Sequence, residues 1–155
     1  MKRIEVKLSL PVVAPLLDVI KAASDTLQNE LASGLTLTDV DPLFRDDWRE
    51  ELQAAQNEEL RTLLSLFDSE FFTNGVVAFD SDNAEIISKA CSAVRLRLRE
   101  KFLKSLADDD LEGGGVDPET LDEPTRKAFM CYLFLATVQE LIIQHLDGAI
   151  LGTDA

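Results

Sequence analysis

The chain has 155 residues, of which 46% are hydrophobic, and its 29 acidic residues outnumber its 15 basic residues to give a formal net charge of −14. This length suits one domain with one core, and the apolar fraction is typical of a folded chain. The negative charge repels a phosphate backbone, and nucleic-acid binding depends on basic side chains. We therefore expect a single domain over residues 1–155 that binds no nucleic acid.

The sequence predicts neither a membrane span nor a signal peptide. Its longest apolar run, at residues 128–138, is well short of the roughly 20 residues that cross a bilayer. Near the start of the chain, Glu5 and Pro11 interrupt the apolar stretch that a signal peptide requires. Cys91 and Cys131 lie among apolar residues, as buried thiols of a reducing compartment do. We expect a cytoplasmic protein, bacterial or other, without a membrane partner, and whether the thiols are redox-active stays open.

The first part of the chain predicts a strand followed by a helix. Apolar and polar residues alternate over residues 3–9, which is the period of a half-buried strand. Apolar residues at helical spacing follow over residues 13–31. Because a proline is harmless in the first turn, Pro15 predicts a helix start near Val12, and Gly34 is the natural end.

The middle of the chain predicts a second helix and a second strand. Asp47 and Glu50 have the spacing of a capping box, and an apolar stripe begins at Trp48, so we expect a helix from about Asp47 to a stop at Asn74-Gly75. The apolar run at residues 76–79 predicts a short strand. The two strands could pair with each other and close one end of a helix bundle.

Two further helices are predicted, from about Asn83 to Leu106 and from a cap at Asp122 to about Leu146. The apolar stripe of the third helix consists of Ile87, Cys91, Val94, Leu98 and Phe102. The fourth helix is apolar almost all round over residues 128–135, which predicts burial on most sides. The fold class is therefore mainly α, a bundle of four main helices with a minor element of two short strands.

An acidic, flexible loop at about residues 107–121 is expected between the third and fourth helices, and part of it has the spacing of a calcium-binding loop. Ligand positions 1, 3, 5 and 12 of an EF-hand loop would be occupied by Asp108, Asp110, Glu112 and Glu119. Against calcium, the glutamate at position 5 is one methylene longer than an aspartate, and Pro118 stands where the exit helix should already run. We therefore favour a solvated acidic linker, and we expect no metal and no cofactor.

The predicted third helix also carries a set of basic residues: Lys89, Arg95, Arg97, Arg99, Lys101 and Lys104. Arg95 and Arg99 share a face beside the apolar stripe, whereas Arg97 shares a different face with Lys101 and Lys104. Without one basic face reinforced by aromatic side chains, this helix does not predict a nucleic-acid groove. We expect Arg95 and Arg99 to be partly buried and paired with acids of another helix.

The sequence contains no recognisable catalytic constellation, so we do not expect an enzyme. It has no glycine-rich phosphate loop, no nucleophile elbow and no cluster of histidine and cysteine. Its single histidine, His145, lies beside apolar residues near the end of the last helix, where a packed or surface role is the usual one.

Two short motifs connect the second half of the chain to a known family. Ala93-Val94-Arg95-Leu96 lies in the third helix and Val138-Gln139-Glu140-Leu141 in the fourth, on either side of the acidic loop. In this order the pieces resemble a bacterial family catalogued as domain-of-unknown-function 2017, over residues 76–147, while the residues before them agree in layout only. The family has Asn-Asp before the arginine, where this chain has Ser92-Ala93. The resemblance implies that the acidic loop is a family feature and not a calcium site.

The resemblance also implies a role, because family members are often encoded beside the adaptor of the Clp protease. We expect a regulatory or adaptor-type protein-interaction module, linked to Clp-type proteolysis or stress regulation, with another protein as its partner; a homo-oligomer is also compatible with the sequence. Its candidate site is a polar stripe of Arg95, Arg99, Gln139 and Glu140, which would serve either an interaction or a hydrogen-bonded register between two helices. The alternative is a small-molecule or metal-binding sensor that uses the acidic loop or a pocket centred on Arg95.

Overall fold

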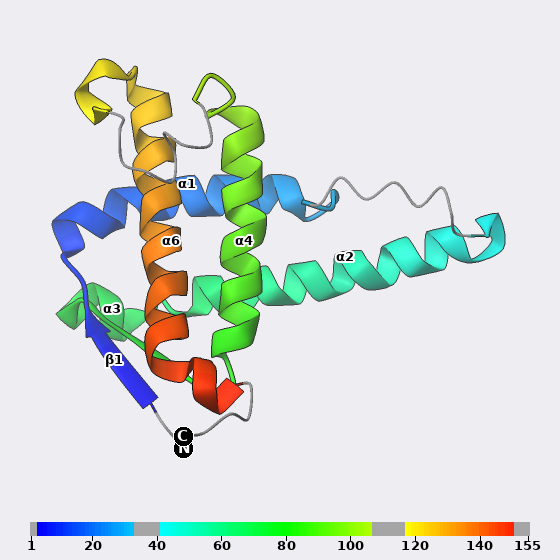
Figure 1. Ribbon diagram of the computed structural model, residues 1–155, viewed down its shortest axis with the longest axis horizontal. Coiled ribbons are helices and arrows are strands. Elements are labelled where there is room, and N and C mark those ends of the chain that lie inside the picture. Colours follow the sequence, from blue (N-terminus) through cyan, green and yellow to red (C-terminus); the bar gives the residue numbers. More distant parts are fainter. Residues whose placement is uncertain (1–2, 33–40, 107–116, 151–155) are drawn as a thin grey trace.

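Four long helices and a two-stranded sheet form the structure, a computed structural model that describes residues 3–32, 41–106 and 117–150, with side chains up to residue 145 (Figure 1). The elements in chain order are β1 (Arg3–Lys7), α1 (Leu10–Leu27), α2 (Pro42–Ser65), α3 (Ser69–Asn74), β2 (Val76–Asp80), α4 (Ala84–Lys101), the short 3-10 helix η2 (Pro118–Thr120) and α6 (Glu123–Ile150). The predicted fold class, mainly α with a minor pair of strands, is confirmed.

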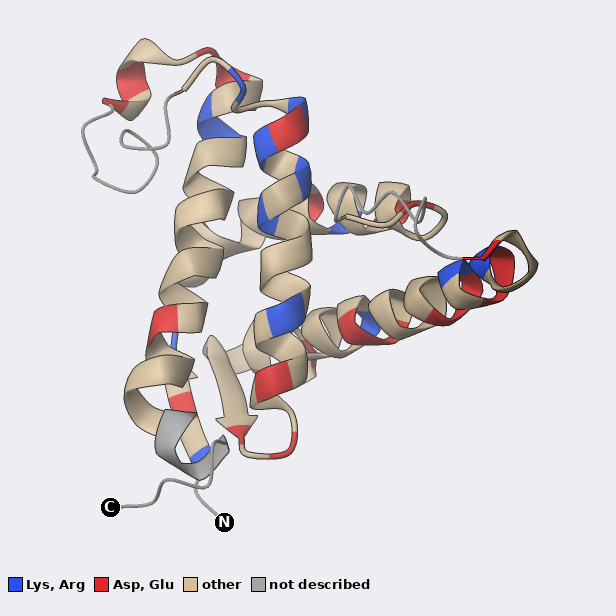
Figure 2. Cartoon of the chain, turned by 45° about the vertical axis from the view of Figure 1, so that its right-hand side comes forward, with Lys and Arg blue, Asp and Glu red and all other residues tan. Residues whose placement is uncertain are grey.

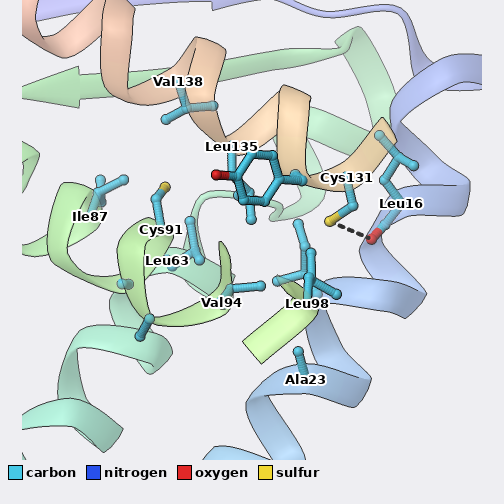
Figure 3. Packing of buried hydrophobic residues seen from close by; sticks show 14 of the residues in the cluster. Leu16, Ala23, Leu63, Ile87, Cys91, Val94, Leu98, Cys131, Leu135 and Val138 are labelled. Carbon is cyan, nitrogen blue, oxygen red and sulfur yellow. Dashed lines mark hydrogen bonds between the residues drawn. The ribbon is translucent and has the colours of Figure 1, made fainter. Parts of the chain in front are cut away.

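Helix α4 is the central element of the core: α6 and α2 pack against it, and α1 crosses both α4 and α6 (Figure 1). Buried apolar side chains of these four helices form one cluster, which includes Leu16, Leu63, Ile87, Cys91, Val94, Leu98 and Leu135 (Figure 3). The predicted α4 stripe is therefore correct from Ile87 to Leu98. Its last member, Phe102, is exposed, because α4 ends at Lys101 rather than near Leu106 and Leu103 is buried instead.

The two strands form a small antiparallel sheet, as the sequence suggested. Arg3 of β1 lies opposite Asp80 of β2, and Lys7 lies opposite Val76. Alternate residues of β2 face inward, since Val77 and Phe79 are buried. The sheet thereby adds apolar side chains to the core beside the ends of the helices.

The predicted second helix is two helices with separate caps. α2 begins at Pro42 and not near Asp47, because Asp41 accepts a hydrogen bond from the backbone N–H of Leu43 over 3.0 Å. It ends at Ser65, and α3 starts behind a second cap, Asp68. The predicted stop at Asn74-Gly75 is confirmed.

Helix α1 differs from the prediction at both ends. It begins at Leu10, so Pro11 occupies the first turn and Pro15 lies inside the helix. It ends at Leu27, before the predicted stop at Gly34, a residue that lies outside the described part of the chain. Helix α1 ends early because side chains of the neighbouring helix α2 form hydrogen bonds to its backbone at this point.

Two glutamines of α2 satisfy the backbone at the end of α1. Nε2 of Gln56 donates to the carbonyl oxygens of Leu27 and Glu30 over 2.8 and 2.9 Å, and its Oε1 accepts from the N–H of Ala32 over 2.9 Å. Nε2 of Gln53 donates to the same Leu27 carbonyl over 2.6 Å. The last carbonyl groups of a helix have no hydrogen-bond donor within that helix. The buried side chain of Gln56, on the neighbouring helix α2, supplies the missing donor at the end of α1.

Helix α6 begins as predicted, where Asp122 accepts a hydrogen bond from the N–H of Thr125 over 3.1 Å, but it ends later, at Ile150. Its apolar middle is less buried than predicted, since Met130 and Leu133 are exposed. Within the described ranges, α6 is the one helix that is long and apolar enough to cross a membrane. Core helices share this length and composition, and α6 packs on α4 and α1.

Candidate functional site

Two members of the predicted polar stripe, Arg95 and Gln139, bond to each other between α4 and α6. Nη1 of Arg95 donates to Oε1 of Gln139 over 2.7 Å. Nε2 of Gln139 donates to the carbonyl oxygen of Ser88 and to Oγ of Ser92, both over 2.8 Å. The guanidinium of Arg95 also lies 4.3 Å from the centroid of the Tyr132 ring, which is a cation–π contact. Gln139 thus connects α6 to three positions of α4 and holds the two helices in register.

The other two members of the stripe have different surroundings. Glu140 is exposed and accepts a hydrogen bond from Gln144, one turn along its own helix, over 3.1 Å. Arg99 is half-buried and belongs to the lining of an open hollow of about 300 Å³, together with Ser92, Arg95, Leu96 and Tyr132. The predicted pocket centred on Arg95 is therefore a surface hollow whose arginine is already bonded to α6.

The most deeply buried charged side chain in the described ranges is that of Arg97. It is 5% exposed, and its Nη2 lies 3.0 Å from Oε1 of Glu30, in the segment after α1. Neither Nε nor Nη2 makes a well-aligned hydrogen bond to any described residue. The sequence placed Arg97 on one helix face with Lys101 and Lys104 but did not predict its burial, which arises because α1 and α2 also pack on this helix. One feature of the sequence does indicate the burial of Arg97: it lies four and seven positions after Ala93 and Ala90, on the same helix face, and both of these small residues are buried.

The acidic loop lies mostly outside the described residues, which include neither Asp108 nor Asp110 nor Glu112. Glu119 is described and lies in η2, where Asp117 accepts a hydrogen bond from its backbone N–H over 3.0 Å. In an EF-hand the second helix follows the loop directly, whereas here a 3-10 turn separates Glu119 from α6. Across the parts of the chain that the structure describes, no three His, Cys, Asp or Glu side chains are placed to hold a metal ion.

The two cysteines are buried free thiols (Figure 3). Burial raises the pKa of the Cys91 thiol to about 12, although the nearby Arg95 lowers it in part. Burial, together with the neighbouring Cys91, raises the pKa of the Cys131 thiol to about 12 as well. The thiolate is the reactive form of cysteine, so both residues act as small apolar core side chains near neutral pH.

The outer half of α2 extends away from α4 and α6 as an arm (Figures 1 and 2). Near its end, Leu43, Phe44 and Trp48 have exposed fractions of 81%, 61% and 48%, and we call these three residues the arm patch. Successive residues of a helix are turned by about 100°, so Phe44 and Trp48 lie on one face of α2. The buried residues Leu60 and Leu63 lie on another face, roughly 100° around the helix axis from the first. The placement of Trp48 in the core stripe was wrong, because the buried residues of α2 lie in its C-terminal half.

One family comparison covers most of the chain. The model of a family described as "Domain of unknown function (DUF2017)" matches residues 18–146. This match is wider than the expected residues 76–147, and it includes the polar stripe, Arg97 and the arm patch. No curated protein and no solved structure matches the chain.

Proposed function

The chain belongs to the DUF2017 family, and from this premise we propose that it is a regulatory or adaptor-type protein-interaction module that binds its partner through the arm patch. The observation that carries the proposal is the joint exposure of Leu43, Phe44 and Trp48 near the end of a protruding helix. Phe44 and Trp48 share one helix face, and neighbouring exposed apolar side chains of this kind are typical of interaction surfaces. Tryptophan is also among the residues that contribute most to protein–protein affinity.

The partner that fits this arm is a protein with an apolar groove bordered by basic side chains. Such grooves bind the apolar face of an amphipathic helix. Exposed acidic residues accompany the arm patch, namely Asp46, Asp47, Glu50 and Glu51. They outnumber Arg45 and Arg49 of the same segment, and the whole chain carries a formal charge of −14. Electrostatic complementarity therefore favours a basic partner surface.

In this proposal the module acts by binding, without an enzymatic reaction or a cofactor, in the cytoplasm of a bacterium. Clp-type proteolysis or stress regulation is the setting that the family resemblance implies. The net charge supports a protein partner over nucleic acid or an anionic membrane surface. Self-association through the arm patch would be opposed by the like charge of the two copies, so we favour a different protein as the partner.

The proposal is tested by capture followed by a direct binding measurement. The tagged protein is used to capture partners from a lysate of its own organism, and the purified partner is then titrated. Because Trp48 is the single tryptophan, its emission should shift to shorter wavelength as the partner covers the indole. The double substitution Phe44→Ala, Trp48→Ala should weaken the complex by about 30-fold or more, since an interface aromatic of this kind contributes about 2 kcal/mol.

Phe72→Ala is the matched control, because it removes an exposed aromatic side chain outside the arm patch. It should leave the affinity unchanged, and added salt should weaken the complex if the partner surface is basic. A partner that binds the double variant as tightly as the unchanged chain would refute a role of the arm patch. A partner lost with Arg95→Ala alone would instead locate the interaction on the polar stripe.

A further inference from the structure

A cavity of about 400 Å³ lies between α1, the C-terminal end of α4 and the first turns of α6. Its lining is mainly apolar and includes Val19, Ala22, Leu98, Phe102 and Ala128. The volume is within the range of small-molecule sites. The lining includes no residue of the polar stripe and none of the arm patch, so this cavity is a separate candidate site.

Basic side chains gather at this cavity, although the chain as a whole is acidic. Arg97, Lys101 and Lys127 belong to its lining, and Asp18 is the one acid among the lining residues that the structure describes. Figure 2 shows Lys and Arg positions at the neighbouring ends of α4 and α6. Lys127 also pairs with Glu123 over 3.9 Å, but both side chains are largely exposed, where such a pair is weak. The local excess of positive charge favours an anionic ligand.

Arg97 has the chemistry to hold the anionic group. Its Nε and Nη2 form the edge of the guanidinium that binds a carboxylate at two points. Neither atom makes a well-aligned hydrogen bond to the described residues, and Nε also has no ion-pair partner among them, which costs free energy for a buried donor. Glu30 approaches only Nη2, over 3.0 Å, from a side chain that is 64% exposed. A ligand carboxylate could take this edge while Glu30 turns into solvent.

We propose that this cavity binds an amphipathic monocarboxylate of the medium-chain fatty-acid type. The carboxylate bonds to Arg97, and the hydrocarbon chain packs on Val19, Leu98 and Ala128. Glu30 acts as an internal competitor for the same guanidinium. The proposal stands independently of the arm patch.

Decanoate is the probe, and its binding to the full chain is measured by isothermal titration calorimetry. We expect octanoate to bind about 15-fold more weakly, because each buried methylene contributes about 0.8 kcal/mol. Decylamine, which joins the same hydrocarbon chain to a cation, should not bind. Absence of decanoate binding, or equal binding of decylamine, would overturn the proposal.

Variants locate the ligand. Arg97→Gln should weaken decanoate binding roughly 10- to 100-fold, the effect of losing charge-assisted hydrogen bonds. Glu30→Gln should tighten binding, because it removes the competing charge. Since a change at a buried arginine can unfold the chain, Ala22→Phe provides a second test: Ala22 is exposed at the cavity, and a ring there should fill it and abolish binding.

Ala54→Phe is the matched control for the filling variant, because Ala54 is an exposed alanine of α2 that does not line the cavity. It should bind decanoate as the unchanged chain does, and so should the arm-patch double variant. Decanoate binding that persists in Ala22→Phe would place the ligand elsewhere and refute the site. The arm-patch proposal and the cavity proposal can therefore be refuted independently of each other.

Discussion

The side-chain oxygen of Gln139 accepts a hydrogen bond from Nη1 of Arg95 over 2.7 Å, and this bond joins α6 to α4 across 44 positions of the sequence. The amide nitrogen of Gln139 is used as well, on Ser88 and Ser92 of the same neighbouring helix. Both ends of the amide are therefore committed to α4. This geometry favours a structural role for the pair over ligand binding.

Gln139→Ala should lower the free energy of unfolding by about 2 kcal/mol, because it removes these bonds and leaves the half-buried Arg95 without one of its acceptors. Urea denaturation measures the change. Arg95→Ala should have an effect of similar size, and the double variant should lose less than the sum of the two. Gln144→Ala, an exposed control on α6, should stay within about 0.5 kcal/mol. If Arg95→Ala unfolds at the same urea concentration as the unchanged chain, the register role is wrong.

Gln56→Ala should destabilise the protein by about 2–3 kcal/mol. The buried amide bonds to the carbonyls of Leu27 and Glu30 and to the N–H of Ala32, and these groups would lose their partner. The change is measured by chemical denaturation, with the exposed Gln28→Ala as the control. Equal midpoints for the two variants would mean that α1 does not depend on this contact from α2.

Gly75→Ala should cost about 2 kcal/mol or more. The residue has φ of 72°, a conformation that costs an L-residue with a side chain about 1–2 kcal/mol. A Cβ atom would also lie 2.6 Å from the backbone oxygen of Leu8, so the chain would have to move. Asn74→Ala, one position earlier, keeps the same turn and should change the midpoint of thermal unfolding far less. If Gly75→Ala leaves the midpoint of thermal unfolding unchanged, the close approach of Gly75 to Leu8, between α3 and the sheet, is wrong.

Cys91 and Cys131 should resist thiol reagents near neutral pH in the folded protein and react after unfolding in urea. Each thiol has a pKa of about 12 in the folded chain, against an ordinary value near 9. The folded state therefore keeps protons that the unfolded state releases. Their stabilising contribution is complete below about pH 9 and is lost as the pH rises toward 12. A Cys91→Ala, Cys131→Ala variant should show a shallower loss of stability over this range, and rapid labelling of the folded chain would contradict the burial.

The sequence by itself determined those features that depend on residues a few positions apart. The alternation in β1, the stop at Gly75 and the cap at Asp122 follow from local backbone and side-chain chemistry. The same holds for the buried stripe from Ile87 to Leu98, because a helix repeats its faces at a fixed interval. Two of the four stripe residues, Arg95 and Gln139, also proved to be bonded to each other.

Only the tertiary structure decided which surfaces are covered. Helix α1 ends at Leu27 because Gln56, 29 positions away, bonds to its carbonyl. Arg97 is buried because neighbouring helices cover its side of α4, and Trp48 is exposed because its half of α2 extends beyond the core. The helical repeat shows which residues share a face. Whether that face is buried depends on which other segments, distant in the chain, pack against it. That is why two members of the polar stripe, Arg95 and Gln139, could be placed together from the sequence, whereas the arm patch and the Arg97 cavity could not.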